Sequence, residues 1–456
     1  MARKRAIIVG TGPTGMFSAL ELSKNPNLEI LMFDKGPFRK KRTEDNLISG
    51  WGGAGAFSDG KLTLPNPKFP KSLNVGGQLS SLVGKKIFLE LVNYVNRLYM
   101  EFGGEASNYE NNHKKIQQLA DNASTFGLRI IPTRVRHFGS DLSPLIVRNI
   151  KEELNERGVK IYLETPVKSI RRRNGKYLVR TAGKNAGEFK SSFVIVAPGR
   201  EGADWLARQA ELLGIEIQPR EADVDVGVRV EVPHHIFSPV TDYLYDPKIE
   251  FFPKPFEDKI RSFCCCPYGE VLVEKYRGLL VTVNGHSLYE KKLSENTNFA
   301  LLVSSHFTEP FKEPLRYAGR ISELANMLGG KILLQRLGNL RDGRRSDPKK
   351  IAQGLVEPTL KEATPGDLSY ALPFRHLTSI LKMLEALDKI APGINGDDTL
   401  LYGNEVKFYS SRIRTSKELE AAENLFVGGD GAGITRGLLQ SSASGVWIAR
   451  AIAKRI

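Results

Sequence analysis

The chain is poor in cysteine. Only three of its 456 residues are cysteines, and they are adjacent, at Cys264, Cys265 and Cys266. A disulfide framework needs cysteines spread along the chain, so none is expected, and the composition fits a reducing compartment. Adjacent side chains that alternate across a strand do not converge on one metal ion, and the seven histidines lack metal-binding spacing. We therefore expect no metal site. Inert thiols at a strand end are the favoured interpretation of the cysteines, and a strained vicinal disulfide or a reactive thiolate is the alternative.

Long apolar runs are also absent. No stretch approaches the roughly 18 uninterrupted apolar residues that a membrane-spanning helix needs. The basic start Met1–Arg5 is followed by a short apolar run, Ala6–Val9, and then by glycine, which is too little for a signal peptide. We expect a cytoplasmic protein without a transmembrane segment.

Acidic residues are fewer than basic ones, with 51 Asp and Glu against 66 Lys and Arg, which leaves a net charge of +15. The remaining composition, 41% hydrophobic and 26% charged, is that of a globular protein and excludes a disordered, collagenous or coiled-coil chain. The charge excess suggests an anionic partner, and nucleotides, acidic substrates, nucleic acid and membrane surfaces all remain open.

The two ends of the chain carry the pattern of a parallel α/β sheet. Ala6–Val9 and Leu28–Phe33 are short apolar runs that predict buried strands, and Thr14–Lys24 between them has helical periodicity. Phe193–Ala197 and Asn424–Gly428 predict two further buried strands. A strand–helix–strand unit of this kind predicts an α/β fold with covered sheet faces.

The region from about residue 205 to 415 differs in character. Val224–Val232 alternates strictly and predicts a half-buried antiparallel strand, and Leu401–Phe408 predicts another strand. Leu315–Leu328 and Leu377–Ile390 predict helices. We therefore expect an α+β domain inserted into a discontinuous nucleotide domain, with boundaries at 1–70, 71–130 (a helical insertion), 131–204, 205–415 (the α+β domain) and 416–456.

A glycine motif follows the first strand. Gly10, Gly12 and Gly15 form the G-x-G-x-x-G pattern of dinucleotide-binding turns, and Asp34 ends the second strand 19 residues later. The following helix, beginning near Pro13 and Thr14, offers its N-terminus to phosphates. An acid at position 34 accepts bonds from a ribose and favours FAD or NAD over NADP. The alternative is a glycine turn without a ligand.

Three more segments combine glycines with strand ends or loops. Gly50–Leu62 holds closely spaced glycines that expose N–H groups for an anion or a flat ring. Phe193–Arg200 ends a strand in small residues, and Leu425–Gly445 contains strand, glycine turn and helix. Each also has an ordinary structural interpretation: a flexible loop, a plain strand end, or a strand–turn–helix without a ligand.

Together these motifs resemble those of FAD-dependent dehydrogenases, and the chain looks most similar to uncharacterised bacterial and archaeal flavoproteins. These are similar to the wider one-Rossmann group that includes fumarate reductases and geranylgeranyl reductases. The resemblance covers nearly the whole chain and implies a Rossmann-like FAD/NAD(P)-binding domain with an inserted α+β substrate domain.

The resemblance also implies cofactor-binding roles. Gly10, Gly12, Pro13, Thr14 and Gly15 would hold the pyrophosphate of FAD. Asp34, beside Lys35, would bind the adenosine ribose, and Val167 would pair with adenine through its backbone. Further residues would line the nucleotide, ribityl chain or flavin ring: Gly53, Ser58, Asp59, Gly60, Ala197, Pro198, Gly199, Gly429, Asp430, Gly433, Ile434, Gly437 and Leu438.

Only one complete G-x-G-x-x-G stands in a strand–helix–strand setting, so a second, dedicated NAD(P)H domain is not expected. If NAD(P)H donates electrons, it docks transiently.

Candidates for the substrate side lie in the inserted domain. Arg341 and Arg344 belong to a basic segment, 331–350, with seven Lys or Arg against two Asp. Arginine binds carboxylate or phosphate bidentately, so this segment is a candidate anchor for an anionic substrate. A solvated run of charges is the alternative.

Glu405 and Lys407 alternate onto one face of a predicted strand and are candidate polar groups at a flavin ring. The alternative is an exposed strand face. His286 follows another strand and is a candidate proton donor, although a lone histidine is more often structural.

The combined prediction is an FAD-dependent oxidoreductase that transfers a hydride between bound FAD and an unidentified, anionic small molecule held between the two domains. An isoprenoid or lipid reductase at a membrane surface is one alternative. A flavin-bearing RNA-binding or RNA-modifying protein is another. The sequence leaves the oligomeric state open.

Overall fold

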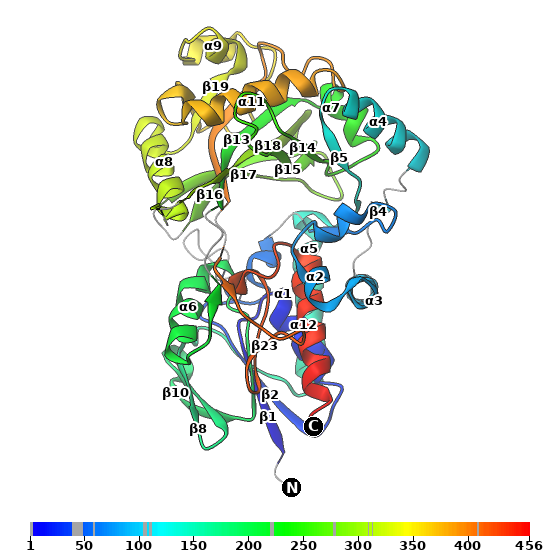
Figure 1. Cartoon of the computed structure of the whole chain (residues 1–456), viewed down its shortest axis with the longest axis vertical. Coiled ribbons are helices and arrows are strands. Elements are labelled where there is room, and N and C mark those ends of the chain that lie inside the picture. Colours follow the sequence, from blue (N-terminus) through cyan, green and yellow to red (C-terminus); the bar gives the residue numbers. More distant parts are fainter. Residues whose placement is uncertain are drawn as a thin grey trace. The chain divides into compact units, whose positions relative to one another are not determined.

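The computed structural model describes residues 3–38, 49–57, 60–103, 107–108, 112–218, 223–276, 280–308, 310–311, 313–407 and 410–456. The chain divides into two compact units (Figure 1). Unit 1 comprises Met1–Ser107, Arg136–Arg220 and Ser410–Ile456, and unit 2 comprises Asn108–Val135 and Glu221–Tyr409. The helical insertion expected at 71–130 is therefore not one body, because its residues are shared between the two units.

The core of unit 1 is a six-stranded sheet in the order β23-β24-β11-β1-β2-β7. Its strands are β1 (Lys4–Val9), β2 (Leu28–Phe33), β7 (Lys160–Tyr162), β11 (Phe193–Val196), β23 (Glu420–Ala422) and β24 (Leu425–Val427). All pairs are parallel except β23 with β24 at one edge. The apolar runs form these strands because a parallel sheet buries both faces. The predicted α/β, Rossmann-like class is confirmed.

Unit 1 also contains helices (Figure 1). They are α1 (Pro13–Leu22), α2 (Leu79–Val83), α3 (Lys85–Glu101), α5 (Gly139–Glu156), α6 (Ala203–Leu212) and α12 (Leu438–Ala453). Helices α1 and α12 lie against each other, and a Cβ added at Gly445 would lie 2.2 Å from the carbonyl oxygen of Thr14. The small residues of α12 therefore serve a close helix–helix contact.

Smaller elements complete unit 1. The predicted meander is a three-stranded antiparallel sheet of β8 (Val167–Arg173), β9 (Lys176–Thr181) and β10 (Gly187–Ser191). Short pieces are β3 (Lys61–Leu64), β12 (Ile217–Gln218), β22 (Arg412–Ile413) and the 3-10 turns η3 (Gly53–Phe57), η4 (Pro70–Asn74), η5 (Gly183–Asn185), η6 (Arg200–Gly202) and η8 (Asp430–Ala432). Strands β4 (Ser107–Asn108) and β6 (Arg134–His137) fall where the chain passes from one unit to the other.

Unit 2 is built on an eight-stranded sheet in the order β20-β19-β21-β13-β18-β15-β14-β5. The strands are β5 (Arg129–Ile131), β13 (Asp223–Pro233), β14 (Lys248–Phe251), β15 (Ile260–Pro267), β18 (Asn296–His306), β19 (Leu333–Arg336), β20 (Thr364–Pro365) and β21 (Leu400–Lys407). Its helices are α4 (His113–Thr125), α7 (His234–Thr241), α8 (Pro314–Gly329), α9 (Leu337–Arg341), α10 (Pro348–Ala352) and α11 (Phe374–Leu387), with a 3-10 turn η7 (Leu368–Tyr370).

The two faces of β13 differ in chemistry. Val224, Val226, Val228, Val230 and Val232 point into an apolar core shared with α8 and α11. The opposite face carries Asp225, Arg229 and Glu231, and these are buried as well. The expectation of a half-buried strand is therefore wrong.

The reason is a hairpin of β16 (Glu270–Tyr276) and β17 (Leu280–His286), which lies over the polar face. A Cβ at Gly285 would lie 2.1 Å from Arg229 Nη2, so only glycine allows this approach.

Within the described residues, no helix is long and apolar enough to span a lipid bilayer.

Candidate functional site

The glycine motif of unit 1 lies between β1 and α1. A Cβ at Gly10, where φ is +100°, would lie 2.1 Å from the carbonyl oxygen of Ala197, and one at Gly15 would lie 2.0 Å from that of Gly10. These two glycines are required by packing. Gly12 differs, since a Cβ there would have just Gly53 Cα within 4 Å, at 3.9 Å. One side of Gly12 therefore faces open space.

Helix α1 begins immediately after Gly12 and is uncapped. Pro13 is its first residue, no side chain caps its N-terminus, and its first turn, which includes Thr14, contains no acid. The first N–H groups of a helix have no partner within the helix, and they carry a partial positive charge. This terminus therefore suits an anion.

The second glycine segment lies across the start of α1. A Cβ at Gly53 would be 3.0 Å from Gly12 Cα, and one at Gly55 would be 3.3 Å from Pro13 Cγ and 2.8 Å from Leu438 Cδ2. The turn η3 thus contacts the first residues of both α1 and α12. Gly60 packs elsewhere, since a Cβ added at Gly60 would lie 2.6 Å from Ser143 Oγ. Ser58 and Asp59 lie outside the described residues.

The C-terminal glycine turn joins the same cluster. A Cβ at Gly429, where φ is +76°, would lie 2.7 Å from Thr14 Oγ1. Asp430 Oδ1 accepts hydrogen bonds from Thr435 Oγ1 at 2.8 Å and Ser441 Oγ at 2.9 Å. Within the described residues, no hydrogen-bond or ion-pair partner is found for Asp430 Oδ2. One carboxylate oxygen is thus fixed and the other is available.

Residues after Asp430 lead into α12. Gly433 has a φ of +71°, and the Ile434 carbonyl accepts a bond from Gln78 N at 3.0 Å. Gly437 precedes α12, which begins at Leu438 with no side-chain cap and no acid in its first turn. A second uncapped helix N-terminus therefore belongs to the cluster.

The third predicted segment, Ala197, Pro198 and Gly199, follows β11. Its Ala197 N–H bonds the carbonyl of Val9 at 2.8 Å, which ties this strand end to β1. Gly199 has a φ of +65°, and a Cβ at Gly431 would lie 2.4 Å from the Gly199 carbonyl oxygen. The turns after β1, β11 and β24 are thus packed against one another.

Asp34 lies at the end of β2 and is fully hydrogen-bonded. Oδ2 accepts from Thr11 N and Thr11 Oγ1, both at 2.9 Å, and Oδ1 accepts from Gly36 N at 2.9 Å and Gly50 N at 2.8 Å. The neighbouring Lys35 forms an ion pair with Glu201, with 2.8 Å between Nζ and Oε2. Val167 begins β8 and lies opposite Thr181.

The residues around Gly12 fit a dinucleotide. Two uncapped helix N-termini, an open-sided glycine and a free oxygen of Asp430 are the groups that a pyrophosphate with an adjoining hydroxylated chain requires. We call this arrangement the glycine cradle, defined by Gly12, Gly53, Asp430, Gly437 and Leu438. The individual roles in FAD binding stay predictions.

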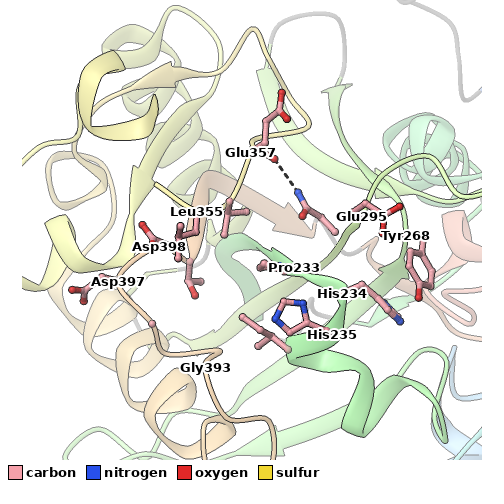
Figure 2. Close-up of a pocket in the computed structure, with 15 residues that line it drawn as sticks. Pro233, His234, His235, Tyr268, Glu295, Leu355, Glu357, Gly393, Asp397 and Asp398 are labelled. Carbon is pink, nitrogen blue, oxygen red and sulfur yellow. Dashed lines mark hydrogen bonds between the residues drawn. The ribbon is translucent and has the colours of Figure 1, made fainter. Parts of the chain in front are cut away.

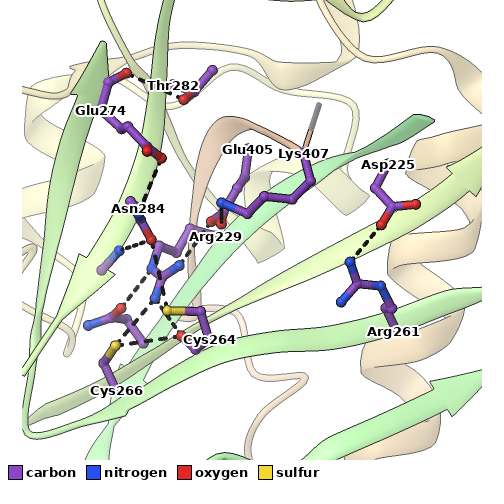
Figure 3. Close-up of polar contacts among 12 residues, drawn as sticks. Asp225, Arg229, Arg261, Cys264, Cys266, Glu274, Thr282, Asn284, Glu405 and Lys407 are labelled. Atoms are coloured by element: carbon purple, nitrogen blue, oxygen red, sulfur yellow. Dashed lines mark hydrogen bonds and ion pairs between the residues drawn. The ribbon is translucent and has the colours of Figure 1, made fainter. Parts of the chain in front are cut away.

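The polar face of unit 2 contains a buried ion-pair chain (Figure 3). Arg229 Nη1 lies 3.0 Å from Glu405 Oε2, and Lys407 Nζ lies 3.0 Å from Glu405 Oε1. Arg229 and Glu405 are 0% exposed, and Lys407 is 8% exposed. Glu405 and Lys407 therefore share a face, as predicted, but that face is buried.

Arg229 is held by further groups around it. Its Nε donates to Asn298 Oδ1 at 2.7 Å, and its Nη2 donates to the Cys264 carbonyl at 2.7 Å and contacts Cys266 Sγ at 3.6 Å. Burial lowers the pKa of Arg229, but Glu405 and the two cysteines raise it more, so the net pKa is raised. The guanidinium is permanently charged.

The cysteines occupy an irregular part of β15. The pairing of β15 with β18 shifts between Phe263 and Cys266, and Cys264 has a φ of +48°. This bulge interrupts the alternation that the sequence predicted. Among the described residues, none of the three cysteines is joined in a disulfide bond. Within the described residues, no group of side chains suits a metal ion.

Cations gather around Phe263 next to the ion-pair chain. Lys407 Nζ lies 5.1 Å from the ring centroid, Lys248 Nζ lies 5.4 Å from it and Arg261 Cζ lies 4.9 Å from it. Arg261 also pairs with Asp225 at 2.6 Å. We call Phe263, Lys248, Arg261 and Lys407 the cationic platform.

The two predicted arginine anchors have acidic partners. Arg341 pairs with Asp397 and also donates to the Asn395 carbonyl at 3.0 Å, and Arg344 pairs with Asp342. Both guanidinium groups are therefore already engaged by carboxylates. His286 is the last residue of β17, opposite Glu270 in the hairpin.

Asp397 lines a cavity of about 640 Å³ in unit 2 (Figure 2). Its wall also carries Asp398, Glu295 and Glu357, together with His234 and other residues. Asp398 and Glu357 pair with Arg336 and Lys361. Two arginines of the basic segment 331–350, Arg336 and Arg341, thus pair with carboxylates at this cavity. Arg341, Arg344 and Arg345 are nevertheless exposed, which agrees with the alternative of a solvated run of charges.

Sequence reasoning missed Arg229 and Asn298. A usable signal was present, because strict alternation in β13 puts Arg229 on the face opposite the valines. What the sequence does not reveal is the hairpin that buries this face.

Comparison with known proteins gives a consistent but partial match. Residues 224–408, within unit 2, match the family model described as FAD-dependent protein, C-terminal domain-like. An uncharacterised protein of Clostridium beijerinckii is 25% identical to the chain, covering 99% of it and 81% of that protein.

Among solved structures, the flavin-dependent halogenase CmlS is 13% identical with a TM-score of 0.44, and the match covers 100% of this chain and 58% of the halogenase. Glycine oxidase from Geobacillus kaustophilus is also 13% identical, with a TM-score of 0.39 and coverage of 99% and 95%.

Proposed function

We propose that the protein is an FAD-dependent oxidoreductase that transfers a hydride between FAD and a small anionic substrate. The observation that carries the proposal is the glycine cradle. Gly12 presents an open side at an uncapped helix N-terminus, while its neighbours Gly10 and Gly15 are closed by packing. The family model that matches unit 2 describes FAD-dependent proteins and supports the same cofactor.

The chain's own residues have separate tasks in this proposal. The N–H groups at the start of α1 and α12 neutralise the pyrophosphate without placing a cation beside it. Gly12 and Gly53 let the phosphates approach the backbone, and Asp430 Oδ2 accepts a hydrogen bond from a hydroxyl of the ribityl chain. When bound, FAD supplies the two-electron chemistry, and the protein supplies position and electrostatics.

The cationic platform of unit 2 is the group that we assign to an anionic substrate. The cations of the platform are paired as well: Lys407 with Glu405, Lys248 with Asp246 and Arg261 with Asp225. Glu405 is shared with Arg229, so four cations share three carboxylates among these side chains. This excess of positive charge supports the assignment, whereas Arg341 and Arg344 each have an aspartate of their own. The Phe263 ring offers a flat apolar surface beside Lys407. A carboxylate of the substrate would pair with the cations of the platform, and an apolar part of the substrate would lie against the Phe263 ring. NAD(P)H as the electron donor stays a prediction.

The proposal is tested by the flavin content of the purified protein and by its reconstitution with FAD. Wild-type protein is expected to be yellow, or to become yellow when FAD is added. The variant Gly12→Ala is the sharp test, since Gly12 has a φ of −73° and its Cβ would meet no atom closer than 3.9 Å. The added methyl fills the cradle without straining the fold.

We expect Gly12→Ala to keep the melting temperature of the FAD-free protein and to weaken FAD binding at least about 10-fold, which corresponds to about 1.4 kcal/mol. Gly187→Ala in the exposed strand β10 is the matched control and should bind FAD normally. Colourless protein that cannot be reconstituted would refute the proposal, and so would unchanged affinity in Gly12→Ala.

A further inference from the structure

The carboxylate at the end of β2 is saturated by protein donors. A carboxylate offers about four acceptor positions, and Asp34 uses four of them for Thr11, Gly36 and Gly50, at distances of 2.8–2.9 Å. Three of these donors are backbone N–H groups. A ribose hydroxyl would therefore have to displace a bond that holds the surrounding turns together.

These turns leave little room for rearrangement. A Cβ at Gly36 would lie 2.5 Å from Gly50 N, and one at Gly50 would lie 2.0 Å from the Pro37 carbonyl oxygen. The Asp34 backbone is fixed as well, because its N–H bonds the Tyr162 carbonyl and its carbonyl accepts from Thr165 N. The hydrogen bonds of Asp34 thus hold three segments of the chain together.

A second carboxylate lies beside the residues that Asp34 holds together. Glu201, in turn η6 after β11, pairs through Oε2 with Lys35 Nζ at 2.8 Å and accepts a hydrogen bond from Ser49 Oγ at the same oxygen. Lys35 and Ser49 are the chain neighbours of Asp34 and Gly50. Glu201 therefore reaches the same region of unit 1 from a different strand end.

Glu201 differs from Asp34 in its remaining capacity. Within the described part of the chain, no partner is found for Glu201 Oε1, and the side chain is 16% exposed, so solvent or a ligand can reach it. Lys35 and Ser49 hold Oε2 in place and thereby orient the other oxygen. Gly199, just before η6, has no atom within 4 Å of its Cβ direction, so the backbone there borders open space.

We infer that Glu201, and not Asp34, recognises the ribose hydroxyls of the bound adenosine, while Asp34 only holds the turns in place. The inference rests on the proposed function, since it concerns the ADP portion of FAD. Recognition of the ribose hydroxyls, which the sequence predicted for the end of β2, is thus assigned to the loop after β11.

The experiment uses the full FAD-free chain and three probes: ADP, 2′-deoxy-ADP and 3′-deoxy-ADP, with affinities measured by titration calorimetry. Wild-type protein is expected to bind ADP at least about 10-fold more tightly than one of the deoxy analogues, as for a hydrogen bond to a charged acceptor. Glu201→Ala should reduce this preference below about 2-fold, and Glu201→Gln should give an intermediate value.

Asp34→Asn should show the opposite pattern. The amide has fewer acceptor positions for the N–H groups around it, so the FAD-free protein should melt at a lower temperature, yet the hydroxyl preference should persist. If Asp34→Asn does not fold, Thr11→Val removes one hydroxyl bond to Asp34 and should also keep the preference. Lys35→Met is the matched control for Glu201, because it removes the ion pair while Ser49 still holds Oε2, so the hydroxyl preference should persist.

The outcomes separate the two proposals. Loss of the hydroxyl preference in Asp34→Asn or Thr11→Val, or its retention in Glu201→Ala, would overturn the inference and leave the FAD proposal standing. Wild-type protein that binds ADP without any hydroxyl preference would do the same. Wild-type protein that binds neither ADP nor FAD would refute the proposed function itself, and this inference with it.

Discussion

Arg229 and Glu405 form an ion pair of 3.0 Å in which both side chains are completely removed from solvent. Their strands are neighbours in the sheet of unit 2, and the β16–β17 hairpin covers them. Burying two charges costs free energy, which is offset here because Asn298 and the Cys264 carbonyl satisfy other donors of the guanidinium. Lys407 adds a third charge and connects this ion pair to the cationic platform, of which it is a member.

Removal of one partner should therefore destabilise the protein strongly. Glu405→Gln leaves Arg229 charged and without its carboxylate, and we expect the free energy of unfolding to fall by about 3–5 kcal/mol. Urea denaturation followed by circular dichroism measures the change.

The matched control is the exposed pair of Glu357 and Lys361. Glu357→Gln should change stability by less than about 1 kcal/mol, because surface pairs contribute little. Equal effects of the two substitutions would contradict the assignment of a buried, mutually dependent pair.

Gly285→Ala should disturb the same site from the hairpin side. The added Cβ would lie 2.1 Å from Arg229 Nη2 and 2.2 Å from Asn298 Oδ1, so the hairpin has to move. Overpacking of this kind costs about 1–3 kcal/mol, and thermal unfolding should show a clear decrease in melting temperature. Gly187→Ala, on an exposed strand, is the control with no expected change. An unchanged Gly285→Ala protein would show that the hairpin does not rest on Arg229.

The α/β sheet of unit 1 was predictable because its signals are local. Leu28–Phe33 is apolar except for Glu29, and β2 has these same bounds. The strands of unit 2 were harder, and β18 (Asn296–His306) was not predicted at all, although it is central in its sheet. Its residues alternate poorly, since both faces are buried, and burial of the second face comes from a distant hairpin.

The glycine turns were also predictable from the sequence, because Gly10, Gly53 and Gly429 adopt positive φ angles that glycine allows, whereas Gly12 has no such backbone requirement. The interaction of Gly53 with Gly12 and of Gly55 with Leu438 follows from strands ending at one edge of a parallel sheet. The sequence could not predict that all acceptor positions of the Asp34 carboxylate are occupied, since the donors at Gly36 and Gly50 depend on how two loops pack. The same limit applies to Arg341, whose partner Asp397 is 56 residues away.

His376 should make the stability of the protein depend on pH. It is 2% exposed, and burial lowers its pKa to about 4, with Asp258 raising it and Arg375 lowering it by smaller amounts. The unfolded chain has an ordinary histidine pKa of about 6.5. Between these values the unfolded state binds more protons, so stability is complete above pH 6.5 and decreases as the pH falls toward 4.

The loss amounts to about 3 kcal/mol across this window. Denaturation at pH 7.0, 6.0, 5.0 and 4.5 measures it, and His376→Gln should flatten the part of the slope that His376 causes. His113→Gln, at the exposed start of α4, should leave the slope as in the wild type. A slope that persists unchanged in His376→Gln would show that other groups cause the acid sensitivity.

Asp430 provides the most direct test of the cradle's polar side. Asp430→Asn retains an oxygen that can accept hydrogen bonds from Thr435 and Ser441. Isosteric substitutions at accessible positions change the free energy of unfolding little, so we expect the melting temperature of the FAD-free protein to stay within about 2 °C of the wild type. The open oxygen becomes an uncharged amide, and FAD binding should weaken about 10-fold because a charge-assisted hydrogen bond is lost. Ser441→Ala is the control, as it removes one bond to Asp430 and leaves the open oxygen in place. Fluorescence titration of FAD-free protein with FAD measures the affinity of both variants. If Ser441→Ala binds FAD more weakly than Asp430→Asn, Asp430 acts through the conformation of the turn and not through contact with the cofactor.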